Sequence, residues 1–258
     1  MKAYVVHYRM LRERLGPSVG SLVECGVTVE IVRGWDADQI DCEQITMTSR
    51  ENWARKISLI YPILMANAIS SKEGAAAFAK ALAIYDKKPF NNQDIPKWMA
   101  PRALKPGEVS VLFKHFYALA GIAHGHDLYG IVAEDDILSN AKTNSLFSDA
   151  VSAAYSLNYD YIDLAGGANL HPEKLINTET TTKNVVDISP ARTRTNACYL
   201  ISRRYARLVV NRFFPLAFPI DWHLQHIFAT CPPLRCGWSI EAPFIHGSEL
   251  GAYRSWQS

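Results

Sequence analysis

The sequence has few cysteines, and they form no pattern. There are five, an odd number scattered along 258 residues: Cys25, Cys42, Cys198, Cys231 and Cys236. A secreted disulfide framework is therefore not indicated, and we expect reduced thiols in a cytoplasmic compartment. Cys231 and Cys236 flank two prolines, but no second pair of Cys or His completes a zinc site, so we expect a structural role for them.

Long apolar runs are also missing. No stretch approaches the roughly 20 residues that a membrane-spanning helix needs, and the first seven residues become polar too early for a signal peptide. The expected location is the cytoplasm, with at most peripheral contact with a membrane.

Neither positive nor negative charge predominates in the sequence. The formal net charge is +2, and the chain has no dense basic run and no basic-aromatic interleaving, so nucleic acid is not the indicated partner. With 48% hydrophobic and 20% charged residues, the composition is that of a globular protein with a substantial core. Internal repeats, low-complexity tracts and linkers are absent from the sequence, which predicts a single domain over residues 1–258.

The most informative stretch is an apolar run, 128–133, that ends in Glu134, Asp135 and Asp136. A run without polar alternation predicts a strand buried on both faces of a parallel sheet. The carboxyl ends of such strands form the ligand crevice of an α/β sheet. Three adjacent carboxylates repel one another, and Mg²⁺ or Mn²⁺ would relieve that repulsion. An acidic turn in water is the alternative, and the sequence leaves it open.

Strand and helix patterns alternate along the rest of the chain. We expect strands at 3–8, 27–32, 159–164 and 197–201, and helices at 18–25, 106–123 and 139–157 and after Ser202 and Pro219. This alternation predicts an α/β fold with a mostly parallel central sheet flanked by helices. Residues 46–105 and 168–194 are expected to be an acceptor-side insertion and a mobile loop.

Basic residues directly follow the first expected strand. Residues 9–14 contain three arginines, and the second strand leads into the polar loop 33–38. The arginines have two interpretations, a solvated helix start or a diphosphate-binding turn. The pattern by itself does not choose between them.

Four motifs in order resemble glycosyltransferase family 25, the lipooligosaccharide and collagen β-galactosyltransferase type. They are Val5-Val6-His7-Tyr8 with Arg12 and Trp35-Asp36-Ala37; Pro106-Gly107-Glu108 with Lys114-His115; Glu134-Asp135-Asp136 as a form of the DXD motif; and 195–202 followed by Pro219-Ile220-Asp221-Trp222. The sequence departs from the family pattern at Lys114, where Ser is usual, and at His7-Tyr8, where Asn-Leu is usual. Both departures concern the donor side.

The resemblance implies a GT-A fold and an inverting hexosyltransferase that moves a sugar such as galactose from a UDP-sugar to a glycan or glycoconjugate acceptor, as in lipopolysaccharide biosynthesis. It implies Mn²⁺ (or Mg²⁺) as cofactor, because a cation stabilises the leaving diphosphate. The residues it implies for the donor are Tyr8, Arg12, Trp35, Asp36, Glu134, Asp135 and Arg194. Asp136 would bind the metal, with Glu134 near the ribose or in the metal shell and His246 as a further ligand by analogy with other GT-A enzymes.

An inverting displacement also needs a general base on the acceptor side. Asp221 is the candidate, and its alternative role is a cap at the start of a helix. Two other functions stay open from the sequence. One is a metal-dependent phosphohydrolase, and the other is a non-catalytic nucleotide-sugar-binding module.

Overall fold

The computed structural model describes residues 1–40, 51–52, 102–167, 170, 172 and 182–253. They are organised around a seven-stranded sheet of order β2-β1-β3-β7-β5-β8-β6, with a second, two-stranded sheet of β4 and β9 beside it. The strands are β1 (Lys2–Val6), β2 (Thr28–Val32), β3 (Tyr129–Glu134), β4 (Ile137–Leu138), β5 (Tyr161–Asp163), β6 (Val185–Asp187), β7 (Cys198–Ser202), β8 (Cys236–Ser239) and β9 (Ile245–His246).

Most strands of the large sheet run in one direction. β1 pairs in parallel with β2 and β3, and β5 pairs in parallel with β8. β7 lies antiparallel between β3 and β5, and β6 is antiparallel to β8. The predicted α/β architecture with a mostly parallel sheet is confirmed.

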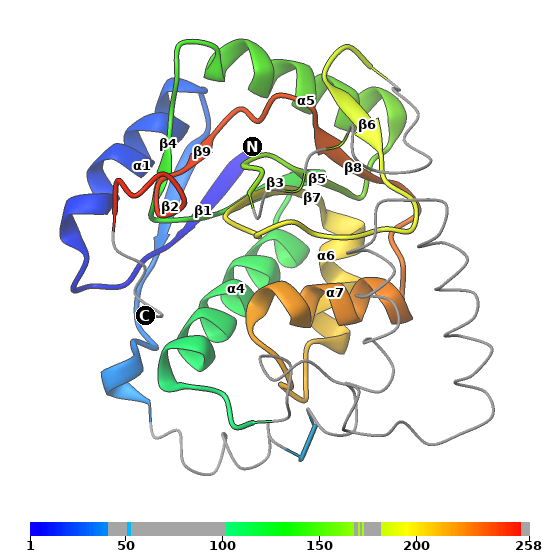
Figure 1. Cartoon of the computed structure of the whole chain (residues 1–258). Coiled ribbons are helices and arrows are strands. Elements are labelled where there is room, and N and C mark those ends of the chain that lie inside the picture. Colours follow the sequence, from blue (N-terminus) through cyan, green and yellow to red (C-terminus); the bar gives the residue numbers. More distant parts are fainter. Residues whose placement is uncertain (41–50, 53–101, 168–169, 171, 173–181, 254–258) are drawn as a thin grey trace.

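Helices cover both faces of this sheet (Figure 1). They are α1 (Arg12–Glu24), α4 (Pro106–His124), α5 (Thr143–Leu157), α6 (Arg203–Arg212) and α7 (Ile220–Thr230), with a short 3₁₀ turn η1 (Ala37–Gln39). α1 and α5 pack on one face, and α4, α6 and α7 pack on the other. None of the described helices is long and apolar enough to cross a membrane.

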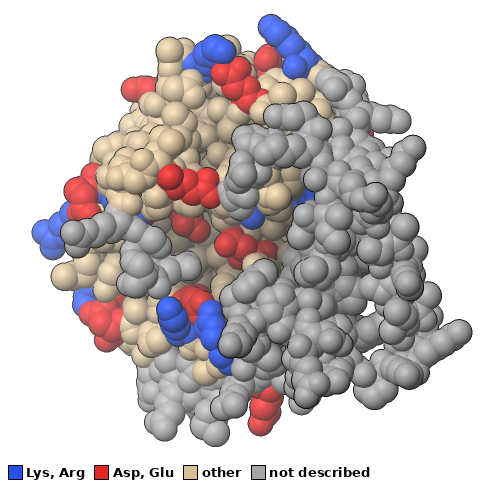
Figure 2. Space-filling view, viewed as in Figure 1, with Lys and Arg blue, Asp and Glu red and all other residues tan. Residues whose placement is uncertain are grey.

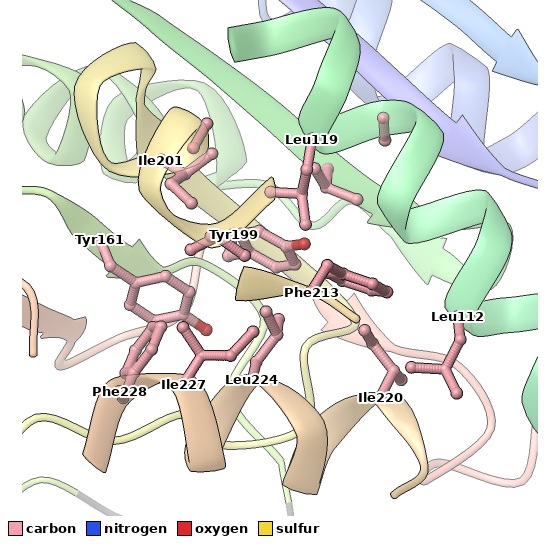
Figure 3. Close-up of a cluster of buried hydrophobic side chains, with 14 of the residues drawn as sticks. Leu112, Leu119, Tyr161, Tyr199, Ile201, Phe213, Ile220, Leu224, Ile227 and Phe228 are labelled. Carbon is pink, nitrogen blue, oxygen red and sulfur yellow. The ribbon is translucent and has the colours of Figure 1, made fainter. Parts of the chain in front are cut away.

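β3 is buried on both faces, as its apolar run predicts. Ile131 and Ala133 belong to the core under α1 and α5, whereas Val132 belongs to the core under α4, α6 and α7. Figure 3 shows this second core, in which Leu112 of α4 lies beside Ile220 of α7. Helices on both sides exclude water from β3, so the acids that follow it are held by a rigid strand.

Two sequence expectations about local structure are wrong. α1 begins at Arg12 and continues through Pro17 and Gly20, although a short helix beginning at Ser18 was expected. Ser18 does not cap a helix, because its hydroxyl donates to the backbone oxygens of Asp135 and Ile137. Packing of the buried face of α1 offsets the cost of the interior proline.

The segment 168–194 is the second difference. It was expected to be a loop, but its described part contains β6, whose Val185 and Val186 are buried at the edge of the sheet. The expected insertion 46–105 lies almost wholly outside the described residues. The assignment of both segments to the acceptor side stays a prediction.

A glycine in β3 allows α4 to lie close to the sheet. A Cβ built on Gly130 would overlap the side chain of Ile122, which is branched and has little rotamer freedom in a helix. We expect Gly130→Ala to lower the free energy of unfolding by about 1–3 kcal/mol, as overpacking does. Urea denaturation measures this change.

Gly20→Ala is the matched control, because a Cβ at Gly20 meets no atom within 4 Å. Gly20 lies in α1, so alanine there should raise stability by up to about 1 kcal/mol. Equal effects of the two substitutions would contradict the close-packing explanation.

Candidate active site

Two segments far apart in the sequence bring together Glu134, Asp136 and His246. Glu134 is the last residue of β3, and Asp136 lies in the turn that follows it. The β4–β9 pairing sets Ile137 opposite His246, which places the imidazole next to this turn. One potential ligand atom from each of the three side chains lies within 4.8 Å of the others. Figure 2 shows carboxylates gathered in a hollow near the middle of one face.

The three side chains strongly affect one another's charge. Burial raises the pKa of Glu134 to about 8, and the charge of Asp136 adds to this rise. Burial lowers the pKa of His246, but its hydrogen bond with Asp136 (Nε2 to Oδ2, 3.2 Å) and the nearby carboxylates outweigh burial and raise it to about 9. Burial also acts to raise the pKa of Asp136, but its bonds with His246 and Ser248 keep it below its ordinary value. At neutral pH the group therefore holds an Asp136–imidazolium pair beside a largely protonated Glu134.

The donor atoms of this group fit a divalent cation. Among the described residues, Asp136 Oδ1 is buried without a hydrogen-bond partner, and so is His246 Nδ1. Two carboxylates and one imidazole form a donor set that Mn²⁺ accepts. The residues predicted as metal ligands thus lie together, although the ligand role itself stays a prediction.

Asp135 points away from its two acidic neighbours. Its Oδ2 lies 2.7 Å from His7 Nδ1 and accepts a hydrogen bond of 3.2 Å from the backbone N–H of Tyr8. Arg14 Nη1 lies 3.8 Å from the other carboxylate oxygen. Asp135 therefore ties the end of β3 to the end of β1, and this contact holds the acidic turn in place.

A pocket of about 530 Å³ opens where β1 and β2 end. Its lining includes Arg9, Arg12 and Arg33 together with His7 and Asp36. The strands are parallel, so their carboxyl ends meet at one edge and bring the arginines of both turns together. Of the residues predicted to bind the donor, Arg12 and Asp36 line this pocket directly.

The two other predicted donor residues near this pocket, Tyr8 and Trp35, flank it. Trp35 is 40% exposed and has a positive φ of 49°. Its ring packs against that of Tyr117, with 5.4 Å between the two ring centroids. Tyr8 carries the backbone N–H that binds Asp135, and Lys114 Nζ lies 5.6 Å from its ring centroid. Neither side chain lines the pocket.

Lys114 connects the donor-side residues, a role that the sequence did not indicate. Its buried ammonium group donates to Asp36 Oδ1 and, at 2.7 Å, to the backbone oxygen of His7. Burial lowers the pKa of Lys114, and the Asp36 carboxylate opposes that shift. Lys114 and His7, the two departures from the family pattern, are therefore in direct contact and hold the loop that carries Asp36 against β1.

Asp221 lies in the first turn of α7, and Pro219 occupies the N-cap position, so the capping role considered for Asp221 is wrong. Its Oδ1 accepts a hydrogen bond of 3.1 Å from Asn196 Nδ2. Burial raises the pKa of Asp221 to about 8, and the charge of Glu134 contributes to the rise. Asp221 therefore lies within electrostatic reach of the acidic cluster.

Three neighbours of the cluster were not among the predicted site residues. Arg14 is 1% exposed, and its charge helps to lower the pKa of Asp136 and opposes the rise in the pKa of Glu134. His115 is fully buried with Nε2 3.8 Å from Glu134 Oε1. Asn196 adopts a positive φ of 55°, which aims its amide at Asp221.

Arg194, also predicted to bind the donor, lies elsewhere. Its Nε and Nη2 bind Asp163 Oδ1 at 2.7 and 2.6 Å, and Nη2 also donates to the backbone oxygen of Ser239. Both charged groups are buried at the end of β5. The guanidinium group of Arg194 is therefore bound to residues of the sheet. Its predicted contact with the nucleotide-sugar donor stays a prediction.

We expect Arg194→Met to lower the free energy of unfolding by about 3–5 kcal/mol, because it leaves Asp163 buried without its counter-charge. Denaturant unfolding measures the loss. Lys142→Met is the control, since Lys142 pairs with Glu241 at the exposed surface, where an ion pair contributes no more than about 1 kcal/mol. An equally small effect of both substitutions would show that the buried pair does not stabilise the fold.

Comparisons with known proteins give only distant similarities. No protein-family model and no curated protein sequence matches the chain. It is similar to the crystal structure of S. aureus TarS 1-349, with a TM-score of 0.42 and 12% identity over 96% of this chain and 60% of that chain. The same protein in complex with UDP-GlcNAc gives a TM-score of 0.40 and 11% identity over 95% and 57%. This chain spans about 60% of the length of the structures it matches.

Proposed function

We propose that the protein is a metal-dependent inverting glycosyltransferase of the family 25 type, which moves a sugar from a UDP-sugar to a hydroxyl group of a glycan or glycoconjugate. One observation carries the proposal. Glu134, Asp136 and His246 converge beside an arginine-lined pocket at the carboxyl edge of the sheet. Galactose as the sugar, a cytoplasmic location and a role in lipopolysaccharide biosynthesis are parts of the proposal.

The pocket at the ends of β1 and β2 suits the nucleotide diphosphate. Its volume of about 530 Å³ is within the usual range for small-molecule sites. Arg9, Arg12 and Arg33 offer charge-assisted hydrogen bonds to phosphate oxygens. His7 lines this pocket and contacts Asp135, so the pocket adjoins the acidic turn. A donor bound there would lie beside the turn that carries the acidic cluster.

Glu134, Asp136 and His246 would hold the cation. When bound, a divalent ion offsets the negative charge that develops on the leaving diphosphate. Asp135 positions the acidic turn through its contacts with His7 and Tyr8. Arg14 supplies a fixed positive charge behind the turn, which limits the repulsion among the acids.

Asp221 would act as the general base. A pKa of about 8 makes the ionised carboxylate of Asp221 a stronger base than an ordinary aspartate, and the fraction that is ionised near neutral pH can take a proton from the acceptor hydroxyl. Asn196 holds one oxygen of Asp221 by a hydrogen bond, which leaves the other available to an acceptor. The opposite face of the sugar ring would then carry the leaving diphosphate, as inversion requires.

The metal-dependent phosphohydrolase is less well supported. Hydrolases that use two metals need a further set of ligands for a second ion, which lies about 3.5–4 Å from the first. Among the described residues, Glu134, Asp136 and His246 form one candidate group. A non-catalytic binding module would use the same residues, and turnover is what distinguishes it from the transferase.

Thermal unfolding with a panel of nucleotide sugars, with and without Mn²⁺, tests the proposal. A ligand that binds the native state at 100 times its Kd adds about 2.7 kcal/mol of stability, which raises Tm by several degrees. We expect a Mn²⁺-dependent rise with one UDP-sugar, followed by UDP release when an acceptor is supplied. Binding without turnover across a broad acceptor panel would indicate the binding module, and no Mn²⁺-dependent shift would reject the proposal.

A further inference from the structure

A second pocket lies at the opposite edge of the sheet, where β3 and β5 begin and β7 ends. Its volume is about 670 Å³. Tyr129 lines it at the start of β3, whereas Glu134 at the other end of that strand belongs to the candidate active site. Five residue steps along a strand span roughly 17 Å. The second pocket is therefore separate from the acidic cluster and from the donor pocket.

Four arginines and one aspartate line this pocket, which gives the lining a formal charge of +3. Asp160 is the aspartate, and its oxygens are already occupied by Ser202, Arg204 and the backbone N–H of Leu234. Arg235 is the most constrained of the cations, because it binds Asp187 through two of its nitrogens. The positive charge that remains is carried by the arginines of α6.

Two of the α6 arginines are held in position by the end of α4. Arg207 Nε donates to the backbone oxygen of Ala123 at 2.7 Å, and Arg203 Nη1 donates to those of Gly125 and His126. These residues are four apart, so they lie on one face of the helix. Within the described part of the chain, no protein acceptor binds either terminal nitrogen of Arg207 or the Nε and Nη2 of Arg203. Their N–H groups are thus fixed in place and available to an anion.

The rim of the pocket is apolar. Leu128 is 57% exposed, Leu234 is 80% exposed and Tyr155 is 47% exposed, and all three line the pocket. Exposed leucines beside arginines fit a ligand that joins an anionic group to an apolar body. A pocket for a fully hydrated ion would not need this rim.

We propose that this second pocket binds a phosphate ester, with Arg203 and Arg207 on the phosphate oxygens and Leu128 and Leu234 against its apolar part. Guanidinium groups pair with phosphate through parallel N–H bonds, which favours phosphate over a single-atom anion. Such an ester is found in a phospholipid headgroup and in a soluble phosphorylated compound. The second pocket does not include Asp136, Asp221 or the donor pocket. The proposal that it binds a phosphate ester is therefore independent of the proposed transferase activity.

Two binding measurements with the full chain in EDTA test this proposal. The first titrates glycerol 3-phosphate and follows amide chemical shifts of residues around the pocket. The second measures co-sedimentation with vesicles of phosphatidylglycerol and phosphatidylcholine, and with phosphatidylcholine alone. We expect Arg207→Gln to weaken binding about five-fold or more in the assay that shows binding, because each arginine near an anionic surface contributes about that factor. Arg207→Lys, which keeps the charge but loses the paired N–H groups, should weaken binding less than Arg207→Gln does.

Arg212→Gln is the control, because Arg212 is an exposed arginine of the same helix that lines neither this pocket nor the donor pocket. It should leave both measurements unchanged, and Arg207→Gln should leave the UDP-sugar shift unchanged. Binding to anionic vesicles that also falls in Leu234→Ser assigns the lipid headgroup, whereas binding of glycerol 3-phosphate alone assigns a soluble ester. Absence of binding in both assays, or binding that Arg207→Gln does not weaken, would overturn the proposal.

Discussion

Asp136→Asn is expected to abolish the Mn²⁺-dependent stabilisation and to weaken Mn²⁺ binding by about 100-fold or more. Loss of supporting contacts alone costs metal sites 10–100-fold, and a direct ligand should cost more. The substitution keeps the shape of the side chain but removes the charge that pairs with His246. Isothermal titration with MnCl₂ measures the affinity, and UDP release in the presence of acceptor measures activity.

The affinity of the native protein for Mn²⁺ should rise with pH. Glu134 and His246 have pKa values of about 8 and 9, so a cation must displace protons from both side chains. Metal binding that requires deprotonated ligands becomes tighter as pH rises through those pKa values. The same titration between pH 6.5 and 9 measures this dependence and includes proton release in the observed heat.

Glu241→Gln is the control for Asp136→Asn. Glu241 is an exposed carboxylate that pairs with Lys142 on the surface, so its neutralisation changes net charge equally without touching the cluster. It should leave Mn²⁺ affinity unchanged. Retention of Mn²⁺ binding by Asp136→Asn would show that the three side chains are an ion pair and a neighbouring acid, and not a metal site.

Asp221→Asn is expected to lower kcat by about 10²–10⁴-fold while the UDP-sugar and Mn²⁺ still bind. General-base catalysis contributes on that order, and an amide cannot accept the proton. Because the pKa of Asp221 is about 8, the native carboxyl is already largely uncharged at pH 7 in the metal-free protein. The neutral, similarly shaped asparagine should therefore leave stability nearly unchanged. Steady-state kinetics and the thermal-shift panel together separate chemistry from binding.

Asp149→Asn on α5 is the matched control, because that helix covers the face of the sheet opposite α7. It should leave kcat unchanged. An unchanged kcat in Asp221→Asn would remove this residue from the mechanism. A joint loss of kcat, donor binding and Tm would instead show that Asp221 supports the structure of the site.

Much of the sheet could be predicted because each strand is indicated by the pattern of apolar residues within a few neighbouring positions. The apolar run before Glu134 identifies a doubly buried strand, since only a strand covered on both faces needs apolar side chains at every position. The expected helix 106–123 differs by one residue from α4, because its apolar residues and Pro106 mark both its body and its start. α1 shows the limit of such signals. Pro17 and Gly20 weaken a helix locally, and only the packing of its buried face decides that it continues.

The sequence by itself determined the α/β fold class and the acidic turn at the end of β3, because periodicity and composition are properties of contiguous residues. Tertiary structure alone decided the partners of each charged side chain. It turned Asp135 toward His7, bound Arg194 to Asp163 and paired Lys114 with Asp36. Such pairings depend on which strand ends meet at one edge of the sheet, and ionic interactions between residues so distant leave no periodic trace in the chain.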